Sequence, residues 1–282
     1  MHPALTLEKR IAAELASYDG HMSVYVDDMR GNTVEIGIDE KFEAASAIKT
    51  YILACLFDQI EKGKASLEET LVYKKEHFVD GSGVIRDMSV GATLCVKDVA
   101  MLMIIVSDNV ATNMMIDYLG LDTINECIQT LGCKDTILHN PIDFNKYDKL
   151  GTTTPRDYAS MFRRLSKGEL ISSWASEQMR EIFRRQHYNS TLTRYFPQYL
   201  LDSEDTGEEE LIYVASKSGS MNACRNDGGI VHTPYGEYVI VIMNKDFYDP
   251  VYHSDHTGQV YGAKVSRLIL DQYLALEGRL VL

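Results

Sequence analysis

Two polar residues at the start of an apolar stretch have the types and spacing needed to form an ester on a serine. Ser46 and Lys49 lie three positions apart where the apolar run 45–61 begins. If that run is a helix, the hydroxyl and the amine share one face of it. Backbone N–H groups at a helix start favour an oxyanion, and burial lowers the pKa of a lysine toward that of a usable base. Ser46 is therefore a candidate nucleophile and Lys49 its candidate base, although an isolated pair of this kind is more often a helix cap beside a stray charge.

The motif Ser107-Asp108-Asn109 would add a second hydroxyl and an amide to such a pair. Ser107 would relay a proton to the nitrogen that leaves when an amide is opened. Asn109 would orient Lys49 or hydrogen-bond an amide of the substrate. By itself the motif is typical of a turn or cap between helices, so its meaning depends on what lies near it.

The motif Lys217-Ser218-Gly219 would complete the set from the edge of a strand. Lys217 would bring a second positive charge, which favours a neutral Lys49 and attracts a substrate carboxylate. Ser218 would hydrogen-bond that carboxylate, and Gly219 would leave room for a substrate to lie along the strand. Each motif alone is common, but the three together, in this order and at these junctions, favour a catalytic site.

The elements that would position these motifs follow from hydrophobic periodicity. Alternating runs on either side of Arg30-Gly31-Asn32 predict a β-hairpin, and 211–219, 227–233 and 237–246 predict three more strands. An amphipathic helix is expected near the N-terminus, with Leu5, Ile11 and Leu15 on one face, and another closes the chain at 262–278. Between them the periodicity predicts helices at 45–61, 95–106, 110–120, 122–132, 155–168 and 172–186, a short helix running into an extended segment at 66–73, and an acidic solvated turn at 201–210.

Strands at both ends and helices between them predict an α/β (α+β) fold. We expect one antiparallel sheet built from the N- and C-terminal strands, flanked by the terminal helices, with an inserted all-α domain. The predicted sheet lobe comprises residues 1–42 and 205–282, and the predicted helical lobe comprises residues 43–204. The active site is expected at their interface, where small-molecule clefts usually lie.

The ordered motifs resemble those of the class A β-lactamase-like branch of the serine β-lactamase and penicillin-binding protein superfamily. The resemblance extends to Gly81-Ser82-Gly83 and to the segments 152–159 and 226–231, so it spans nearly the whole chain. It implies a β-lactamase/transpeptidase-like fold and the opening of β-lactam amides through an acyl-enzyme on Ser46. It also implies an oxyanion hole made by the N–H groups of Ser46 and Ser220.

The loop before the segment 152–159 departs from that family. Class A β-lactamases carry a glutamate there that activates the water for deacylation, but residues 138–155 contain no glutamate. If Asn140-Pro141 aligns with the family's Glu-Pro, an amide occupies the place of the base, and an amide is not a useful proton acceptor. If the loop is shifted, Asp143 is the candidate base and Asn145 would orient the water, although aspartate is one methylene shorter.

Three functions remain open at this stage. The first is a serine β-lactamase, with slow or unusual deacylation. The second is a related serine esterase, amidase or D-peptidase acting on a substrate that is not a lactam. The third is a non-catalytic binding protein, against which the intact Ser46, Lys49, Ser107 and Lys217 argue.

Composition limits the partners. The 282 residues carry a formal net charge of -13, which disfavours nucleic acid and anionic membrane surfaces, and no apolar run is long enough for a transmembrane helix. No nucleotide-binding glycine pattern is present, and His253 and His256 fit a polar loop better than a metal site, so no cofactor or metal is expected. The five cysteines are expected as buried reduced thiols. The N-terminus lacks the pattern of a secretory signal, so the chain as it stands is expected in the cytoplasm; removal of a signal would make it secreted or periplasmic.

Overall fold

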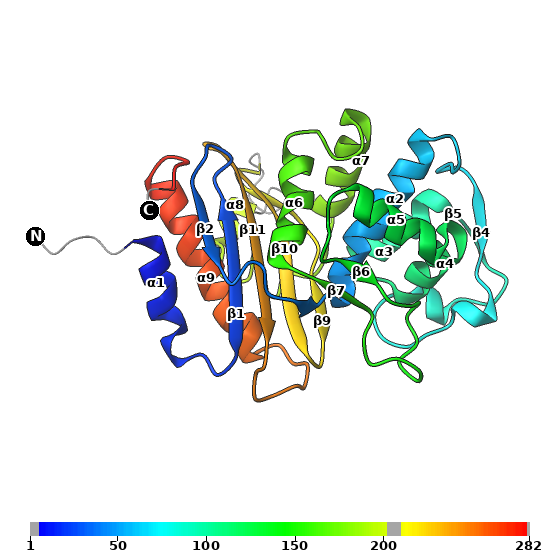
Figure 1. The fold of residues 1–282 in the computed structure, drawn as a ribbon, viewed down its shortest axis with the longest axis horizontal. Coiled ribbons are helices and arrows are strands. Elements are labelled where there is room, and N and C mark those ends of the chain that lie inside the picture. The colour runs from blue at the N-terminus through cyan, green and yellow to red at the C-terminus, as the bar shows by residue number, and fades with distance from the viewer. Residues whose placement is uncertain (1–5, 202–209, 281–282) are drawn as a thin grey trace, which may run out of the picture.

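An antiparallel sheet built from both ends of the chain forms the centre of the molecule (Figure 1). The computed structural model describes residues 6–201 and 210–280. In these residues the strand order is β2-β1-β11-β10-β8, and β9 pairs with a further part of β10. The strands are β1 (His21–Asp27), β2 (Thr33–Ile36), β8 (Tyr213–Ser216), β9 (Gly219–Met221), β10 (Cys224–Thr233) and β11 (Gly236–Lys245). The predicted fold class, hairpin and C-terminal strands are therefore confirmed.

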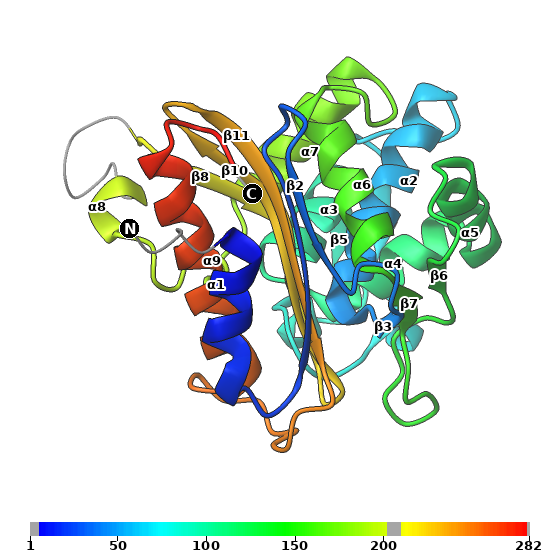
Figure 2. The same cartoon turned by 60° about the vertical axis from the view of Figure 1, so that its left-hand side comes forward.

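Helices cover both faces of this sheet. Figure 2 shows α1 (Leu7–Glu14) and α9 (Thr257–Ala275) packed on one face, with the remaining longer helices on the other. Both terminal helices were predicted, although Leu5 lies outside the described residues. Because both faces are covered, the central strand β11 is buried from Tyr238 to Asn244, and its sequence lacks the apolar–polar alternation of a half-exposed strand.

The segment between β2 and β8 holds most of the helices, and they share one apolar core with the sheet residues that face them. They are α2 (Lys49–Glu61), α3 (Val96–Ile105), α4 (Asn109–Leu119), α5 (Leu121–Thr130), α6 (Pro155–Ser166), α7 (Ser173–Arg184) and the short α8 (Gln198–Leu201). Helix α2 is buried almost all round, as its apolar sequence predicts. The start of α6 is also as predicted, with Thr154 Oγ1 accepting a hydrogen bond from the N–H of Asp157 and Pro155 at the first position.

The segment predicted as all-α also contains two small sheets. One pairs β4 (Thr70–Val72) with β5 (Thr93–Cys95), and the other has the order β3-β7-β6, from Phe42–Glu43, Gly151–Thr153 and Ile137–Leu138. The short helix predicted in 66–73 is wrong, because these residues form a turn and then β4. Their strand partner lies more than twenty residues further along the chain, where local periodicity gives no sign of it.

Two predictions fall on segments that the structure does not describe. The predicted lobe boundary at 204–205 and most of the acidic segment 201–210 lie outside the described residues. The division into two lobes therefore stays a prediction. Within 6–201 and 210–280, no helix combines the length and apolarity needed to cross a membrane.

Candidate active site

Ser46 lies on a tight turn where the chain enters α2. Residues Ala45–Ile48 form a 3-10 helix that continues into the α-helix at Lys49, so the predicted helix start is a tighter turn than expected. Ala45 has a left-handed φ of 46°, a conformation that costs an L-residue roughly 1–2 kcal/mol. Such outliers often mark functional sites. This bend directly precedes the half-buried Ser46, which borders a cleft.

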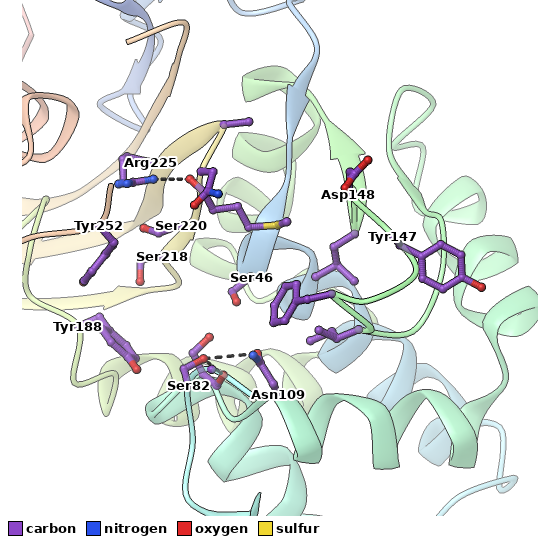
Figure 3. Close-up of a pocket in the computed structure, with 18 of the residues that line it drawn as sticks. Ser46, Ser82, Asn109, Tyr147, Asp148, Tyr188, Ser218, Ser220, Arg225 and Tyr252 are labelled. Atoms are coloured by element: carbon purple, nitrogen blue, oxygen red, sulfur yellow. Dashed lines mark hydrogen bonds between the residues drawn. The ribbon is translucent and has the colours of Figure 1, made fainter. Parts of the chain in front are cut away.

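The cleft brings the three predicted motifs together. Its volume is about 770 Å³, and Ser46, Ser107, Asn109, Ser218 and Ser220 all line it. Figure 3 shows Ser46 in the middle, with Ser218 and Ser220 on the sheet side and Asn109 on the helical side. The predicted substrate-binding residues therefore surround the candidate nucleophile.

Lys49 is completely buried beneath the cleft. Its Nζ lies 2.6 Å from the carbonyl oxygen of Ser107, 3.0 Å from Ser107 Oγ and 2.9 Å from Asn109 Oδ1. Burial and then the charge of Lys217 hold the pKa of Lys49 well below its ordinary value of 10.5, against the opposing charge of Asp108. These conditions favour the neutral amine, which is the form that can accept a proton.

Lys217 approaches the same hydroxyl from the sheet. Its buried Nζ donates to Ser107 Oγ over 3.1 Å and to the carbonyl oxygen of Ser218 over 2.7 Å. Burial lowers its pKa to about 7, although the nearby charge of Asp227 acts in the opposite direction. The hydroxyl of Ser107 therefore lies between two amines whose pKa values are both depressed.

The donor and acceptor types fix the direction of the hydrogen bonds that join Lys217, Ser107 and Lys49 when Lys49 is neutral and Lys217 is charged. A neutral amine has two hydrogens and one lone pair, and the carbonyl of Ser107 and Oδ1 of Asn109 can only accept. The lone pair of Lys49 must then face a hydroxyl, so Ser107 donates to Lys49 and accepts from Lys217. The arrangement is a hydrogen-bonded path for a proton from Lys217 through Ser107 to Lys49, or in reverse.

Asp108, the middle residue of the second motif, fixes the turn that carries Ser107. Its buried carboxylate accepts from the N–H groups of Val84 (2.6 Å), Ile85 (2.9 Å) and Ala111 (2.9 Å). The hydrogen bond from Ala111 makes Asp108 the N-cap of α4. Ser107 itself has a left-handed φ of 53°. Several charge-assisted hydrogen bonds offset the cost of that conformation.

Two further residues hold the third motif and lie far from it in the sequence. Tyr158, buried on α6, donates its hydroxyl to the carbonyl of Lys217 over 2.5 Å. Gln186 Oε1 accepts from both the N–H and the hydroxyl of Ser218, over 2.8 and 3.1 Å. Sequence reasoning missed both residues because nothing local marks a tyrosine or a glutamine as the partner of a distant strand.

Gly219 lies against the nucleophile turn. A Cβ at this position would come within 2.6 Å of the N–H nitrogen of Ala47, 2.7 Å of the carbonyl oxygen of Ala44 and 2.9 Å of the nitrogen of Ser46. Glycine is therefore needed here so that β9 can pack on the turn, a reason different from the expected space for substrate. The close approach places the N–H of Ser46 beside the strand that continues to Ser220.

Asp143 does not join the site. Its carboxylate pairs with Lys146 (3.1 Å) and accepts from the N–H of Asn145 (3.1 Å), and the hydrogen bond from Lys146 is the main reason that the pKa of Asp143 is lowered. Asn140 bonds the carbonyl of Pro141 at the surface. Asp148 borders the cleft, but its carboxylate points away from Ser46 (Figure 3).

Apolar side chains instead form the wall of the cleft on this loop. Ile142, Phe144 and Leu150 line the cavity. The buried Asn113 of α4 fixes the loop there by accepting from the N–H of Ile142 over 2.8 Å and donating to its carbonyl over 2.9 Å. Beside these three side chains, the loop residues that line the cavity are Tyr147 and Asp148.

The remaining sequence candidates have structural contacts. His253 pairs with the carboxylate of Asp249, and His256 bonds the carbonyl of the same residue and caps α9. No cluster of three potential metal ligands occurs in the described part of the chain. Arg225 also borders the cleft, and its guanidinium donates to the carbonyls of Met221, Cys224 and Pro250.

The fold and this site define the class of protein. The family model of the β-lactamase enzyme family matches residues 6–273, so the chain belongs to that family of serine β-lactamase-like hydrolases. Among solved structures it is similar to a β-lactamase from Sphaerobacter thermophilus, with a TM-score of 0.82, 27% identity and coverage of 96% of this chain and 97% of that one. It is also similar to a mutant of PBP-A captured as an acyl-enzyme complex with penicillin G, with a TM-score of 0.80, 29% identity and 97% coverage of both chains.

A curated relative gives the same family. The β-lactamase CARB-3 of Pseudomonas aeruginosa is 28% identical over 180 residues, which is 61% of this chain and 62% of that protein. The chain thus spans less than two thirds of this relative's length.

The scaffold around Ser107 yields a first prediction. Gly83 has φ 107°, and a Cβ there would meet the carboxylate of Asp108 at 2.2 Å, so Gly83→Ala should destabilise the fold by about 2 kcal/mol or more. Gly91→Ala is the matched control, because Gly91 has a similar φ of 96° and nothing within 4 Å of the added Cβ. Urea unfolding of both variants measures the difference. Equal losses would contradict the packing of Gly83 on Asp108.

Proposed function

We propose that this protein is a serine acyl hydrolase that opens β-lactams through an acyl-enzyme on Ser46. The observation that carries the proposal is the buried hydrogen-bonded series Lys49–Ser107–Lys217, whose Ser107 lines the same cleft as Ser46. Family membership supports the substrate class, as does the similarity to a PBP-A mutant whose structure is an acyl-enzyme complex with penicillin G.

In the proposed acylation, the lone pair of neutral Lys49 turns from Ser107 to Ser46, and Ser46 Oγ attacks the lactam carbonyl while its proton passes to that amine. The negative charge that develops on the carbonyl oxygen is held by the N–H groups of Ser46 and Ser220. The C–N bond then breaks, and Ser107 donates its proton to the departing nitrogen. Ser107 regains a proton from one of the two lysines to which it is hydrogen-bonded. The product is an ester between Ser46 and the opened lactam, with no net gain or loss of protons.

Charge complementarity would orient the substrate. Ser218 lines one side of the cleft, and the buried Lys217 donates to its carbonyl, so a substrate carboxylate would be attracted to this side. Asn109 lies on the opposite side and its amide would bond the substrate's own amide. A lactam that carries a carboxylate and an acylamino group would engage both sides at once.

Lys49 provides the direct test of the acylation step. We expect an intact-mass adduct of one penicillin on Ser46 in the wild type, and an acylation rate lowered about 10²- to 10⁴-fold in Lys49→Ala, since a general base contributes about this much. Lys64→Ala, at an exposed lysine just beyond α2, is the matched control and should acylate normally. Unchanged acylation of Lys49→Ala would exclude the base role, and no adduct with any lactam would exclude the proposed function.

The pKa of Lys217 predicts a pH dependence. A group with a pKa of about 7 carries its charge below pH 7 and loses it above, so kcat/KM for a carboxylate-bearing penicillin should fall as pH rises through about 7. A neutral ester should show a shallower fall, because it needs no charge for binding. Lys217→Arg keeps its charge at high pH and should lose this limb of the profile. Identical profiles for wild type and Lys217→Arg would contradict the assignment.

We further propose that the acyl-enzyme is resolved slowly by water. The apolar wall of Ile142, Phe144 and Leu150 supports this, because activating a water requires a base within hydrogen-bond reach. The same wall favours the second candidate function, a serine D-peptidase or esterase whose acyl group passes to another acceptor. Accumulation of the adduct after mixing with a penicillin supports slow hydrolysis, and rapid turnover of the penicillin contradicts it.

Asp143 gives a separate test of the deacylation step. Because its carboxylate faces Lys146, we expect Asp143→Asn to release the acyl group at the wild-type rate, as followed by intact mass after removal of excess penicillin. Lys146→Ala removes only the partner of Asp143 and is the matched control. A slower release in Asp143→Asn alone would return Asp143 to the mechanism.

A further inference from the structure

The carboxylate of Glu43 joins the nucleophile turn to the end of the cleft loop. Glu43 lies on β3, three residues before Ser46. Its Oε1 accepts from the N–H groups of Ala45 (3.2 Å), Leu150 (3.1 Å) and Gly151 (3.1 Å). Its Oε2 is buried and has no hydrogen-bond partner among the described residues. One oxygen therefore makes all the side-chain hydrogen bonds of this residue.

Each of these N–H groups belongs to a residue that shapes the cleft. Ala45 has the left-handed φ that bends the chain just before Ser46. Leu150 is part of the apolar wall, and Gly151 begins β7. Hydrogen bonds to a carboxylate are stronger than those between neutral groups, so they can offset the strain at Ala45.

The backbone of Glu43 is held independently of its side chain. Strand β3 pairs with β7, the N–H of Ala44 donates to the carbonyl of Gly151 over 2.8 Å, and Asn226 Nδ2 donates to the carbonyl of Glu43 over 2.8 Å. Removing the carboxylate would therefore leave the strand paired. The change would instead free the bend at Ala45 and the position of the Leu150 backbone relative to that bend.

We propose that Glu43 is a positioning residue for acylation. It holds Ala45 in its left-handed conformation and thereby keeps Ser46, with its N–H, in place against Gly219 and the strand that leads to Ser220. The same oxygen sets the position of Leu150 at the edge of the cleft. This inference rests on the proposed acylation of Ser46, because only that function makes the position of the Ser46 N–H matter.

The test separates the acceptor oxygen from the volume of the side chain. Glu43→Met fills similar space without an acceptor, Glu43→Gln keeps one oxygen for the three N–H groups, and Glu43→Asp keeps the charge but shortens its reach. We expect Glu43→Met and Glu43→Asp to lower the acylation rate constant about 10- to 100-fold, since small misplacements of a nucleophile cost this much. The noncovalent affinity for penicillin should change less than twofold, and Glu43→Gln should restore the rate to within about threefold of wild type.

Asp28→Ala provides a matched structural control. Asp28 also accepts two backbone N–H groups through one oxygen, from Arg30 (2.9 Å) and Asn32 (3.0 Å), at the turn between β1 and β2. It should lower stability without changing acylation of the folded protein. All rates are measured by stopped flow with a chromogenic lactam, well below the melting temperature of each variant.

Hydrogen exchange makes the inference independent of activity. The amides of Ala45, Leu150 and Gly151 should exchange faster in Glu43→Met than in the wild type, and Glu43→Gln should restore their protection. Wild-type acylation in Glu43→Met, or a Glu43→Gln variant as slow as Glu43→Met, would overturn the proposal. If the wild type reacts with no lactam or ester while these amides behave as expected, the proposed function fails and Glu43 is a structural anchor only.

Discussion

The burial of two lysine amines against one serine hydroxyl is the constraint on which the rest of this structure depends. Lys49 and Lys217 are both inaccessible to solvent, and Ser107 Oγ lies within hydrogen-bond distance of each. Burial lowers both pKa values, and the charge of Lys217 lowers that of Lys49 further, so the neutral form of Lys49 is favoured. Lys49 lies three residues after the candidate nucleophile Ser46, and serine chemistry at neutral pH requires a neutral amine as base.

Holding these groups together requires three parts of the chain that are far apart in sequence. Helix α2 contributes Lys49, the turn before α4 contributes Ser107, and the end of β8 leads into Lys217. A buried polar residue holds each of the last two: Asp108 accepts from N–H groups around the turn, and Tyr158 donates to the carbonyl of Lys217. Such supporting contacts matter because a base or donor misplaced by about 1 Å loses much of its effect.

The loop on the other side of the cleft is built from a different kind of residue. Asn113 and Glu43 fix its two ends, Ile142 and Leu150, by hydrogen bonds to backbone groups, and these two apolar side chains line the cavity together with Phe144, Tyr147 and Asp148. The polar groups that would support acylation are thus concentrated on the sheet and on the helices behind Ser46. This asymmetry is the physical basis for separating the proposed acylation, which has its donors and acceptors in place, from hydrolysis of the ester.

The sequence by itself determined the sheet of terminal strands, the positions of most helices and the identity of Ser46, Lys49, Ser107 and Lys217 as candidates. These are local properties, since hydrophobic periodicity, caps and short motifs lie within a few residues of one another. Only the tertiary structure decided that Asp143 faces Lys146 and that β4, within the segment 66–73, pairs with β5. It also decided that Gln186, Tyr158 and Glu43 support the site. Each of these depends on a partner many residues away or on which way a loop side chain turns, and no local pattern carries that information.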